Sequence, residues 1–242
     1  MRIGPTATDQ LRRFGREWDQ GQHVLLTGGT GWGKTQLARS LMQARLDRNG
    51  YVVVFVGKLR PDATITESYS KSDGWVRWTR WKRPNVFERK ILLWPNTDTP
   101  RTKTLPQKRH LQASIFEDAL DKLSNIGHWS CQFDEGLYMT SPTFLNLANH
   151  IAMLHQMGRS AGLSLMTLAQ RPSHLPLVVY GSATHAFTSR TSVLNDRKRL
   201  SEIGSDDPRS MATILANLPV YDFLWTNARK PGKASEIINL AK

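Results

Sequence analysis

The clearest chemical signal in the sequence is a glycine-rich segment, GGTGWGKT, which fits the pattern G-x-x-x-x-G-K-[ST] in full. Glycines let the backbone wrap closely around phosphate groups, so that several N–H groups can point at the anion. A lysine at this spacing reaches the β- and γ-phosphates, and the hydroxyl that follows it ligates Mg²⁺. The segment therefore predicts a nucleoside triphosphate site. The residues expected around the nucleotide are Gly28, Gly29, Thr30, Gly31, Trp32, Gly33, Lys34, Thr35 and Gln36.

Two adjacent carboxylates can supply the next part of this chemistry. Asp134 and Glu135 directly follow the segment Trp129–Phe133. Hydrolysis of a triphosphate needs an acid in the magnesium shell and a base that orients water. We therefore assign Asp134, with Thr35, to Mg²⁺ and Glu135 to the base. Two solvated acids at a strand end are the alternative reading, because a serine and a glutamine make this segment less apolar than a central parallel strand usually is.

A third polar group follows another apolar segment. Leu163–Ala169 ends in Gln-Arg-Pro, whereas a buried strand usually closes with Gly, Asn or Asp. If this strand lies between the strand before Gly28 and the strand before Asp134, its end faces the γ-phosphate. We then expect Gln170 to hydrogen-bond the γ-phosphate or the attacking water.

These groups need a scaffold that brings several strand ends together. Helical spacing of apolar residues is expected after Thr35, in a stripe formed by Leu111, Ile115, Ala119 and Leu123, over 144–154 and around Pro208–Leu218. The expected strands are His23–Thr27, Tyr51–Val56, Lys90–Trp94, Trp129–Phe133, Leu163–Ala169, Thr184–Ser189 and Tyr221–Thr226. Alternating strands and helices predict an α/β fold, with a mostly parallel sheet and helices on both faces. The expected strand order is that of the additional-strand, RecA-like type of P-loop NTPase.

Composition limits the class of protein. The 242 residues can form one domain, 1–242, and no apolar run approaches the ~20 residues that span a bilayer. The single Cys131 cannot form an internal disulfide, and no signal peptide opens the sequence, so we expect a cytoplasmic protein. The net charge of +13 favours a polyanionic partner, nucleic acid first and an anionic membrane surface second. A basic protein without such a partner is the alternative.

A basic, tryptophan-rich segment, GWVRWTRWKRP, lies within a less regular region at about 62–106 that we interpret as an insertion. Helical spacing would gather its tryptophans on one face, flanked by cations. The tryptophans are Trp75, Trp78 and Trp81, and the basic residues expected to contact DNA are Arg77, Arg80, Lys82 and Arg83. A surface for DNA or a neighbouring subunit is one interpretation. A peripheral helix or hairpin anchored in the core by its tryptophans is the other.

Four segments together resemble the FtsK–HerA superfamily of DNA-pumping ATPases: GGTGWGKT, FDEG, GRSAGLSLMTLAQRPS and SRTSVLNDRKRL. The resemblance covers about 22–198, without 62–106. It implies a ring, hexameric or pentameric, that pumps double-stranded DNA, with Gln170 as the sensor. It also makes Arg159 a finger that reaches into the neighbouring subunit's site, with Arg171 and Arg190 as weaker candidates. A helix-end arginine that binds carbonyl groups is the alternative for Arg159.

Among members of that superfamily, the chain is similar to the compact genome-packaging ATPases of some bacterial and archaeal viruses. That similarity implies ATP and Mg²⁺ as cofactors, and double-stranded DNA and a capsid portal or vertex protein as partners. It also implies the host cytoplasm, or association with the virion, as the location. A conjugative or chromosome-segregation pump is the alternative within the superfamily. A non-translocating P-loop switch or kinase is the alternative outside it.

Overall fold

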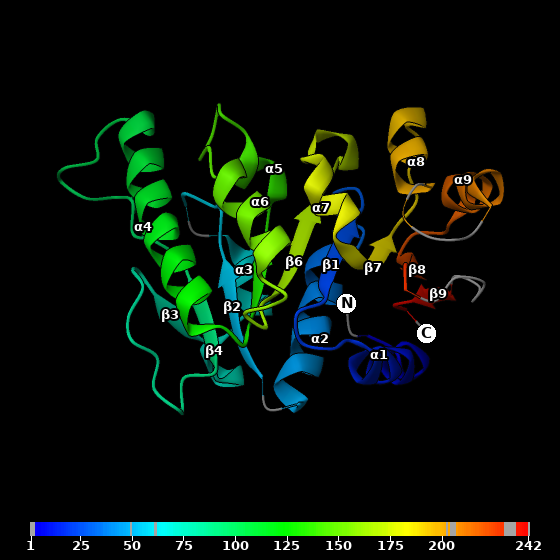
Figure 1. Cartoon of the computed structure of the whole chain (residues 1–242), viewed down its shortest axis with the longest axis horizontal. Coiled ribbons are helices and arrows are strands. Elements are labelled where there is room, and N and C mark those ends of the chain that lie inside the picture. The colour runs from blue at the N-terminus through cyan, green and yellow to red at the C-terminus, as the bar shows by residue number, and fades with distance from the viewer. Residues whose placement is uncertain are drawn as a thin grey trace.

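The computed structural model describes residues 3–48, 50–60, 62–201, 203, 207–229 and 236–241. A nine-stranded sheet forms its centre, in the order β3-β4-β2-β5-β6-β1-β7-β8-β9, with helices packed around it (Figure 1). The strands are β1 (His23–Thr27), β2 (Tyr51–Phe55), β3 (Val76–Trp78), β4 (Lys90–Leu93), β5 (Trp129–Phe133), β6 (Ser164–Ala169), β7 (Ala183–Thr188), β8 (Asp222–Asn227) and β9 (Glu236–Asn239). Across the described ranges, none of the helices combines the length and apolar character needed to cross a membrane.

Strands β1 to β7 all pair in parallel, and only β8 and β9 run antiparallel to their neighbours. Every residue of β1, β5, β6 and β7 is buried, as expected of parallel strands covered on both faces. Strand β6 lies between β1 and β5, with Thr27 of β1 level with Ala169 and Phe133 of β5 level with Thr167. The predicted mostly parallel α/β fold and the position of the Leu163–Ala169 strand are therefore confirmed.

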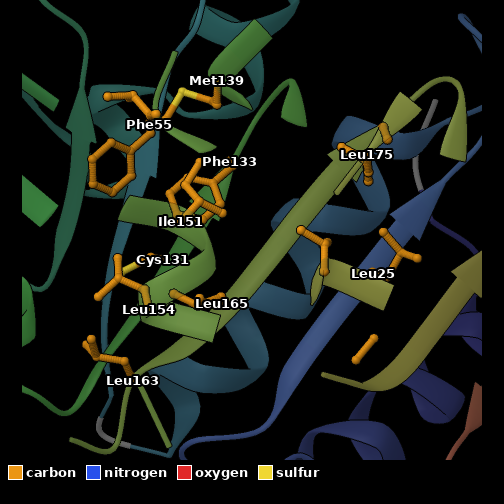
Figure 2. Packing of buried hydrophobic residues seen from close by; sticks show 14 of the residues in the cluster. Leu25, Phe55, Cys131, Phe133, Met139, Ile151, Leu154, Leu163, Leu165 and Leu175 are labelled. Carbon is orange, nitrogen blue, oxygen red and sulfur yellow. The ribbon is translucent and has the colours of Figure 1, made fainter. Parts of the chain in front are cut away.

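Helices cover both faces of the sheet, as predicted (Figure 1). They are α1 (Pro5–Glu17), α2 (Lys34–Asp47), α3 (Ala63–Ser68), α4 (Leu105–Ile126), α5 (Gly136–Thr140), α6 (Ala148–Met157), α7 (Leu177–Gly181), α8 (Leu194–Ser201) and α9 (Pro208–Asn217). One core packs under α1, α2 and α3 and includes Val24 and Leu26 of β1. The other core packs under α4 to α9 and includes Leu25, because successive side chains of a strand point to opposite faces of the sheet. In this second core, Ile151 and Leu154 of α6 lie over Cys131 and Leu165 (Figure 2).

The buried face of α4 agrees with the predicted one at Ala119 and Leu123 and differs in the first half of the helix. Gln112, Phe116 and Leu120 are buried, whereas Leu111 and Ile115 are only partly covered. The reason is a polar pairing: the Gln112 amide donates to the Val56 carbonyl at 3.0 Å, and its oxygen accepts from the Tyr138 hydroxyl at 3.0 Å. A paired glutamine can be buried at little cost, so the helix turns a polar residue inward.

The tryptophans of the segment 74–84 do not share a helix face, and that prediction is wrong. Trp78 ends β3, Trp75 packs in the core under α1, α2 and α3, and Trp81 packs in the core on the other face. The Trp81 ring lies 5.3 Å from that of Trp78 and 5.6 Å from that of Trp129. All three are at most 6% exposed. They anchor the β3–β4 edge in the core and present no rings to a partner.

The polar residues of β5 are paired inside the protein. Ser130 accepts from Nε of Arg45 at 3.1 Å, and Gln132 exchanges hydrogen bonds with the Tyr69 hydroxyl at 2.8 and 3.0 Å. Buried polar groups with such partners cost little free energy. Strand β5 is therefore a central strand in spite of its composition.

Candidate nucleotide site

The glycine-rich loop connects β1 to α2 and is shaped by its glycines. Gly31 and Gly33 have φ values of 79° and 87°, which side chains disfavour. Gly33 caps α2, so the N–H groups of the helix N-terminus are directed at the loop. A Cβ on Gly28 would come within 2.2 Å of the Ser189 hydroxyl. The loop therefore has the backbone geometry that phosphate groups require.

Lys34 lies inside this loop. Its ammonium donates to the carbonyl oxygens of Gly28 at 2.7 Å and Gly29 at 2.8 Å. Burial lowers the pKa of Lys34, while the carboxylates of Glu135 and Asp134 oppose that change. A partly desolvated cation interacts strongly with an anion that enters the same space.

The strand order brings the two carboxylates and Gln170 to the same edge of the sheet as the loop, because the carboxyl ends of β5, β6 and β1 lie side by side. The Thr30 hydroxyl donates to the Gln170 side-chain oxygen at 3.3 Å, and the Gln170 amide donates to Glu135 Oε2 at 3.2 Å. A chain of hydrogen bonds thus runs from the phosphate loop through Gln170 to Glu135.

The two carboxylates are raised in pKa. Burial raises the pKa of Asp134 to about 6; Lys58 and Lys34 oppose this rise, whereas Glu135 and Asp62 add to it. Burial also raises the pKa of Glu135, against Lys34, the hydrogen bond from Gln170 and Lys58. Raised pKa values are typical of carboxylates that act as bases or bind cations.

One cavity of about 450 Å³ joins these groups. The phosphate loop, Asp134, Glu135 and Gln170 line it, together with Lys58 and Tyr221, which sequence reasoning did not assign to the site. The described residues hold no group of three or more His, Cys, Asp or Glu side chains that could bind a metal ion by themselves. The oxygen donors available to a cation in this cavity include the Thr35 hydroxyl and the Asp134 carboxylate.

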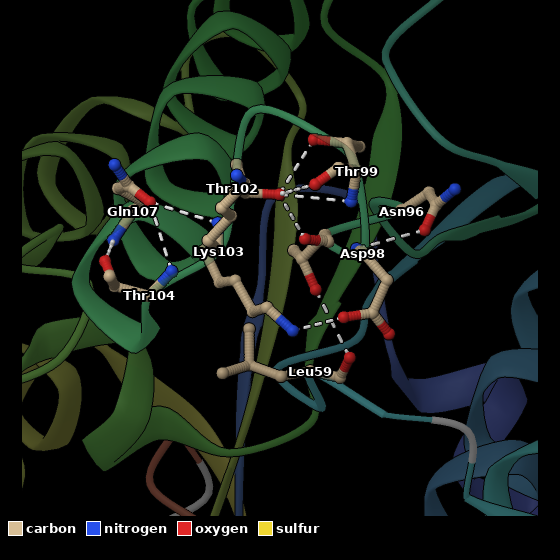
Figure 3. A network of polar contacts seen from close by, with 10 residues as sticks. Leu59, Asn96, Asp98, Thr99, Thr102, Lys103, Thr104 and Gln107 are labelled. Carbon is tan, nitrogen blue, oxygen red and sulfur yellow. Dashed lines mark hydrogen bonds and ion pairs between the residues drawn. The ribbon is translucent and has the colours of Figure 1, made fainter.

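Lys58 is the cation that sequence reasoning missed. It follows β2, the neighbour of β5, and its ammonium lies 3.7 Å from Asp62 Oδ2. The available signal was a lysine just after a buried strand, which no motif marks. Its loop is braced from outside, since the Thr97 hydroxyl donates to the Leu59 carbonyl at 3.3 Å and Thr102 in turn holds the Thr97 carbonyl (Figure 3).

The three candidate arginines lie in different places. Arg171 donates through Nε to buried Asp196 at 2.9 Å, and the Arg190 guanidinium lies 5.0 Å from the Trp32 ring centroid. Arg159 is exposed before β6, near Gly21 and thus at the edge opposite the phosphate loop. The six residues of β6 separate the edges by about 20 Å. Arg159 therefore does not join the site of its own chain.

The four basic residues expected at DNA are exposed at the β3 edge, far along the sheet from β1. The Arg77 guanidinium stacks 4.8 Å from the Trp94 ring centroid, and the Lys82 ammonium lies 6.0 Å from the Trp78 ring centroid. Arg80 and Arg83 extend the same exposed surface. The structure does not bring these residues to the nucleotide cavity.

Comparison with known proteins finds the same fold in several ATPases. No family model and no curated protein matches the sequence. The genome packaging NTPase B204 from Sulfolobus turreted icosahedral virus 2 is 17% identical, with a TM-score of 0.61 over 91% of this chain and 96% of that one. VirB4 of Thermoanaerobacter pseudethanolicus is 9% identical, with a TM-score of 0.63 over 91% and 89%. The pCW3 conjugation coupling protein TcpA is 13% identical, with a TM-score of 0.56 over 92% and 60%.

The chain therefore shares its fold with a genome packaging NTPase and a conjugation coupling protein, as the resemblance drawn from the motifs predicts. B204 has also been solved in complex with ATP-gammaS, at 16% identity to this chain and a TM-score of 0.59. Identities this low carry the fold and no more. What the chain does has to be argued from its own residues.

Proposed function

We propose that this protein is a Mg²⁺-dependent ATPase that assembles into a ring and translocates double-stranded DNA, packaging a viral genome. The observation that carries the proposal is the single cavity in which the phosphate loop meets Asp134, Glu135 and Gln170. In it, Lys34 would bind the β- and γ-phosphates, Glu135 would orient the attacking water, and Gln170 would sense the γ-phosphate.

Magnesium fits the residues present. A hydroxyl and a carboxylate, from Thr35 and Asp134, are the hard oxygen ligands that this ion prefers, and it usually completes its shell with water and substrate phosphates. Burial with Glu135 and Asp62 disfavours the anionic form of Asp134, and a cation would relieve that cost. When bound, the ion would neutralise charge developing on the phosphate oxygens.

Double-stranded DNA is the proposed polyanion. The chain carries a net charge of +13, and sequence-independent gripping needs only contacts to phosphates. Packaging is the use that we propose for such a motor, and the fold is shared with a genome packaging NTPase. A capsid portal or vertex protein would then be the docking partner, and the host cytoplasm or the virion the place of action.

The first experiment measures the steady-state ATPase rate with and without long double-stranded DNA, with Lys34→Ala as the blank. We expect strong stimulation by duplex DNA and weak stimulation by single strands. A rate indifferent to nucleic acid would contradict translocation. A rate equal to the blank under every condition would contradict the ATPase itself.

The ring is tested separately through Arg159. Because this residue lies at the edge opposite its own phosphate loop, a role as a finger would require it to act on a neighbouring subunit. Arg159→Ala should abolish hydrolysis and keep ATP binding. Mixing it with Glu135→Gln protein should restore part of the rate, since some interfaces then combine an intact finger with an intact base. No recovery at any ratio would contradict a finger between subunits.

A conjugative or chromosome-segregation pump is the second candidate, favoured by the fold shared with TcpA and VirB4. It would use the same site and differ in the partner that the ring docks on. A switch or small-molecule kinase is disfavoured by Glu135, because a water-orienting base beside the metal carboxylate serves hydrolysis. ATP turnover that requires an added acceptor, with the γ-phosphate transferred to it, would favour the kinase.

A further inference from the structure

A tyrosine that lines the nucleotide cavity has a backbone conformation that its residue type disfavours. Tyr221 is the third residue of a β-turn between α9 and β8, closed by the Asp222 N–H donating to the Pro219 carbonyl at 3.2 Å. Its φ is +70°. The third position of a turn with positive φ calls for glycine or asparagine, because a Cβ is strained there.

Two other non-glycine residues in the described part of the chain have positive φ, His128 and Asn146. Both belong to types that tolerate this region, whereas a bulky aromatic residue is an outlier. Such outliers are concentrated at ligand sites, where surrounding contacts hold them. Tyr221 is held in this way: its carbonyl accepts from the Leu240 N–H at 3.0 Å, and it packs half-buried against the core under α1, α2 and α3.

The sheet places Tyr221 on the side of the phosphate loop away from the carboxylates. Strand β8 is two strands from β1 in the direction opposite to β6 and β5. Because β8 runs antiparallel to β7, its first residues lie at the same edge as the phosphate loop. The cavity thus extends from Asp134 and Glu135, past Lys34, to Tyr221.

The order of groups along the cavity matches the order of groups in a nucleotide. The γ-phosphate belongs at the carboxylates and Lys34, where water attacks. The α-phosphate and the nucleoside must then extend in the other direction, along the first turn of α2 where Gln36 lines the cavity. Tyr221 is the aromatic side chain that lines this cavity within the described ranges.

We propose that the ring of Tyr221 stacks on the base of the bound nucleotide, and so makes the site selective for nucleoside triphosphates over inorganic polyphosphate. This inference rests on the proposed nucleotide site and adds its base-binding residue. An aromatic face stacks on any base, so the expected effect is on nucleoside binding and not on the choice between adenine and guanine.

The test measures dissociation constants by calorimetry for Mg²⁺–ATPγS and for Mg²⁺–tripolyphosphate, which lacks the nucleoside. The full-length variants are Tyr221→Ala, Tyr221→Gly and Tyr221→Phe. Glycine is the matched control, since it removes the ring and suits the positive φ, so the turn is retained. We expect Kd for ATPγS to rise about tenfold in the alanine and glycine variants, within the range of base stacking. The phenylalanine variant should match the wild type, and tripolyphosphate should bind all four proteins equally.

Each outcome bears on a separate claim. Unchanged ATPγS affinity in the glycine variant would overturn the stacking role and leave the nucleotide site intact. Equal losses for ATPγS and tripolyphosphate in that variant would also overturn it, because the turn would then act only through the phosphate loop. A wild-type protein that binds neither ligand, like Lys34→Ala, would overturn the proposed function and the role of Tyr221 with it.

Discussion

Both edges of the parallel sheet bury polar side chains, but they treat them differently. At the amino edge, His23 Nδ1 accepts from the Leu165 N–H at 3.1 Å, so its Nε2 carries the proton that it donates to the His155 carbonyl at 3.2 Å. His155 Nδ1 bonds the Ser182 hydroxyl at 2.7 Å. At the carboxyl edge, Asp134 and Glu135 line an open cavity beside two lysines.

The direction of the pKa shifts separates the two edges further. Burial lowers the pKa of His23 to about 4 and that of His155 to about 3, so both are neutral, and both ring nitrogens of His23 are paired within the protein. Burial raises the pKa of both carboxylates, while Lys34 and Lys58 oppose the rise at each of them. A buried neutral group that is paired within the protein supports the fold. A carboxylate with a raised pKa that lines an open cavity is typical of a functional site. Four measurements test this difference between the two edges of the sheet.

The largest difference is expected in catalysis. Glu135→Gln keeps the shape of the site and removes the base, so the ATPase rate should fall by about 10² to 10⁴-fold while ATPγS still binds. His23→Gln, the matched change at the amino edge, should leave the rate within about twofold once its loss of stability is allowed for. An equal loss of rate in both variants would erase the distinction between the edges.

Acid should weaken the amino edge. Between pH 6.5 and about 4 the unfolded chain protonates His23 and the folded chain does not, so stability is lost as pH falls through this window. The loss is roughly 3 kcal/mol for a group shifted this far. Chemical denaturation at pH 7 and pH 4.5 measures it, and His23→Gln should flatten the dependence. If the His23→Gln variant lost as much stability between pH 7 and pH 4.5 as the wild type, groups other than His23 would cause the loss.

Asp134 should respond in the opposite direction. Its raised pKa means that the folded chain takes up a proton near pH 6 and the unfolded chain only near 3.8, so this group destabilises the fold above pH 6. Asp134→Asn should therefore raise the free energy of unfolding at pH 7.5 by about 1–3 kcal/mol while abolishing Mg²⁺-dependent hydrolysis. Asp118→Asn, at an exposed position paired with Lys122, is the control. A destabilised Asp134→Asn protein would show that the carboxylate is a structural group.

The smallest effect is expected at β3, the outermost strand, whose exposed cations lie away from both groups of buried polar residues. Neutralising the four exposed cations should lower the slope of log K against log salt for DNA binding by about 0.9 for each DNA phosphate that the protein no longer neutralises. The changes are Arg77→Ala, Arg80→Ala, Lys82→Ala and Arg83→Ala. Removing Arg12 and Arg16 from the exposed surface of α1 controls for net charge. If the slope changed equally per charge removed in the β3 variant and in the α1 control, the DNA would not bind specifically at β3.

Much of the site could be predicted from sequence because its chemistry is local. The phosphate loop needs glycines and a lysine at set spacing, and Asp134, Glu135 and Gln170 each follow directly after a strand. Seven of the nine strands could be found from apolar runs. The short β3 and β9 could not, since each has only one buried residue. Helix α1 was missed although Ala7, Leu11 and Phe14 recur at helical spacing and are buried.

The chemical groups and the strand ends that carry them follow from the amino-acid order alone. The contacts between these groups depend on how the strands pair. Lys58 joins the site because β2 pairs with β5, and Tyr221 joins it because β8 reverses direction beside β7. The tryptophans of 74–84 and Gln112 are buried because partners distant in sequence receive them. Burial and long-range pairing depend on which segments pack together, and a motif of adjacent residues does not determine those contacts.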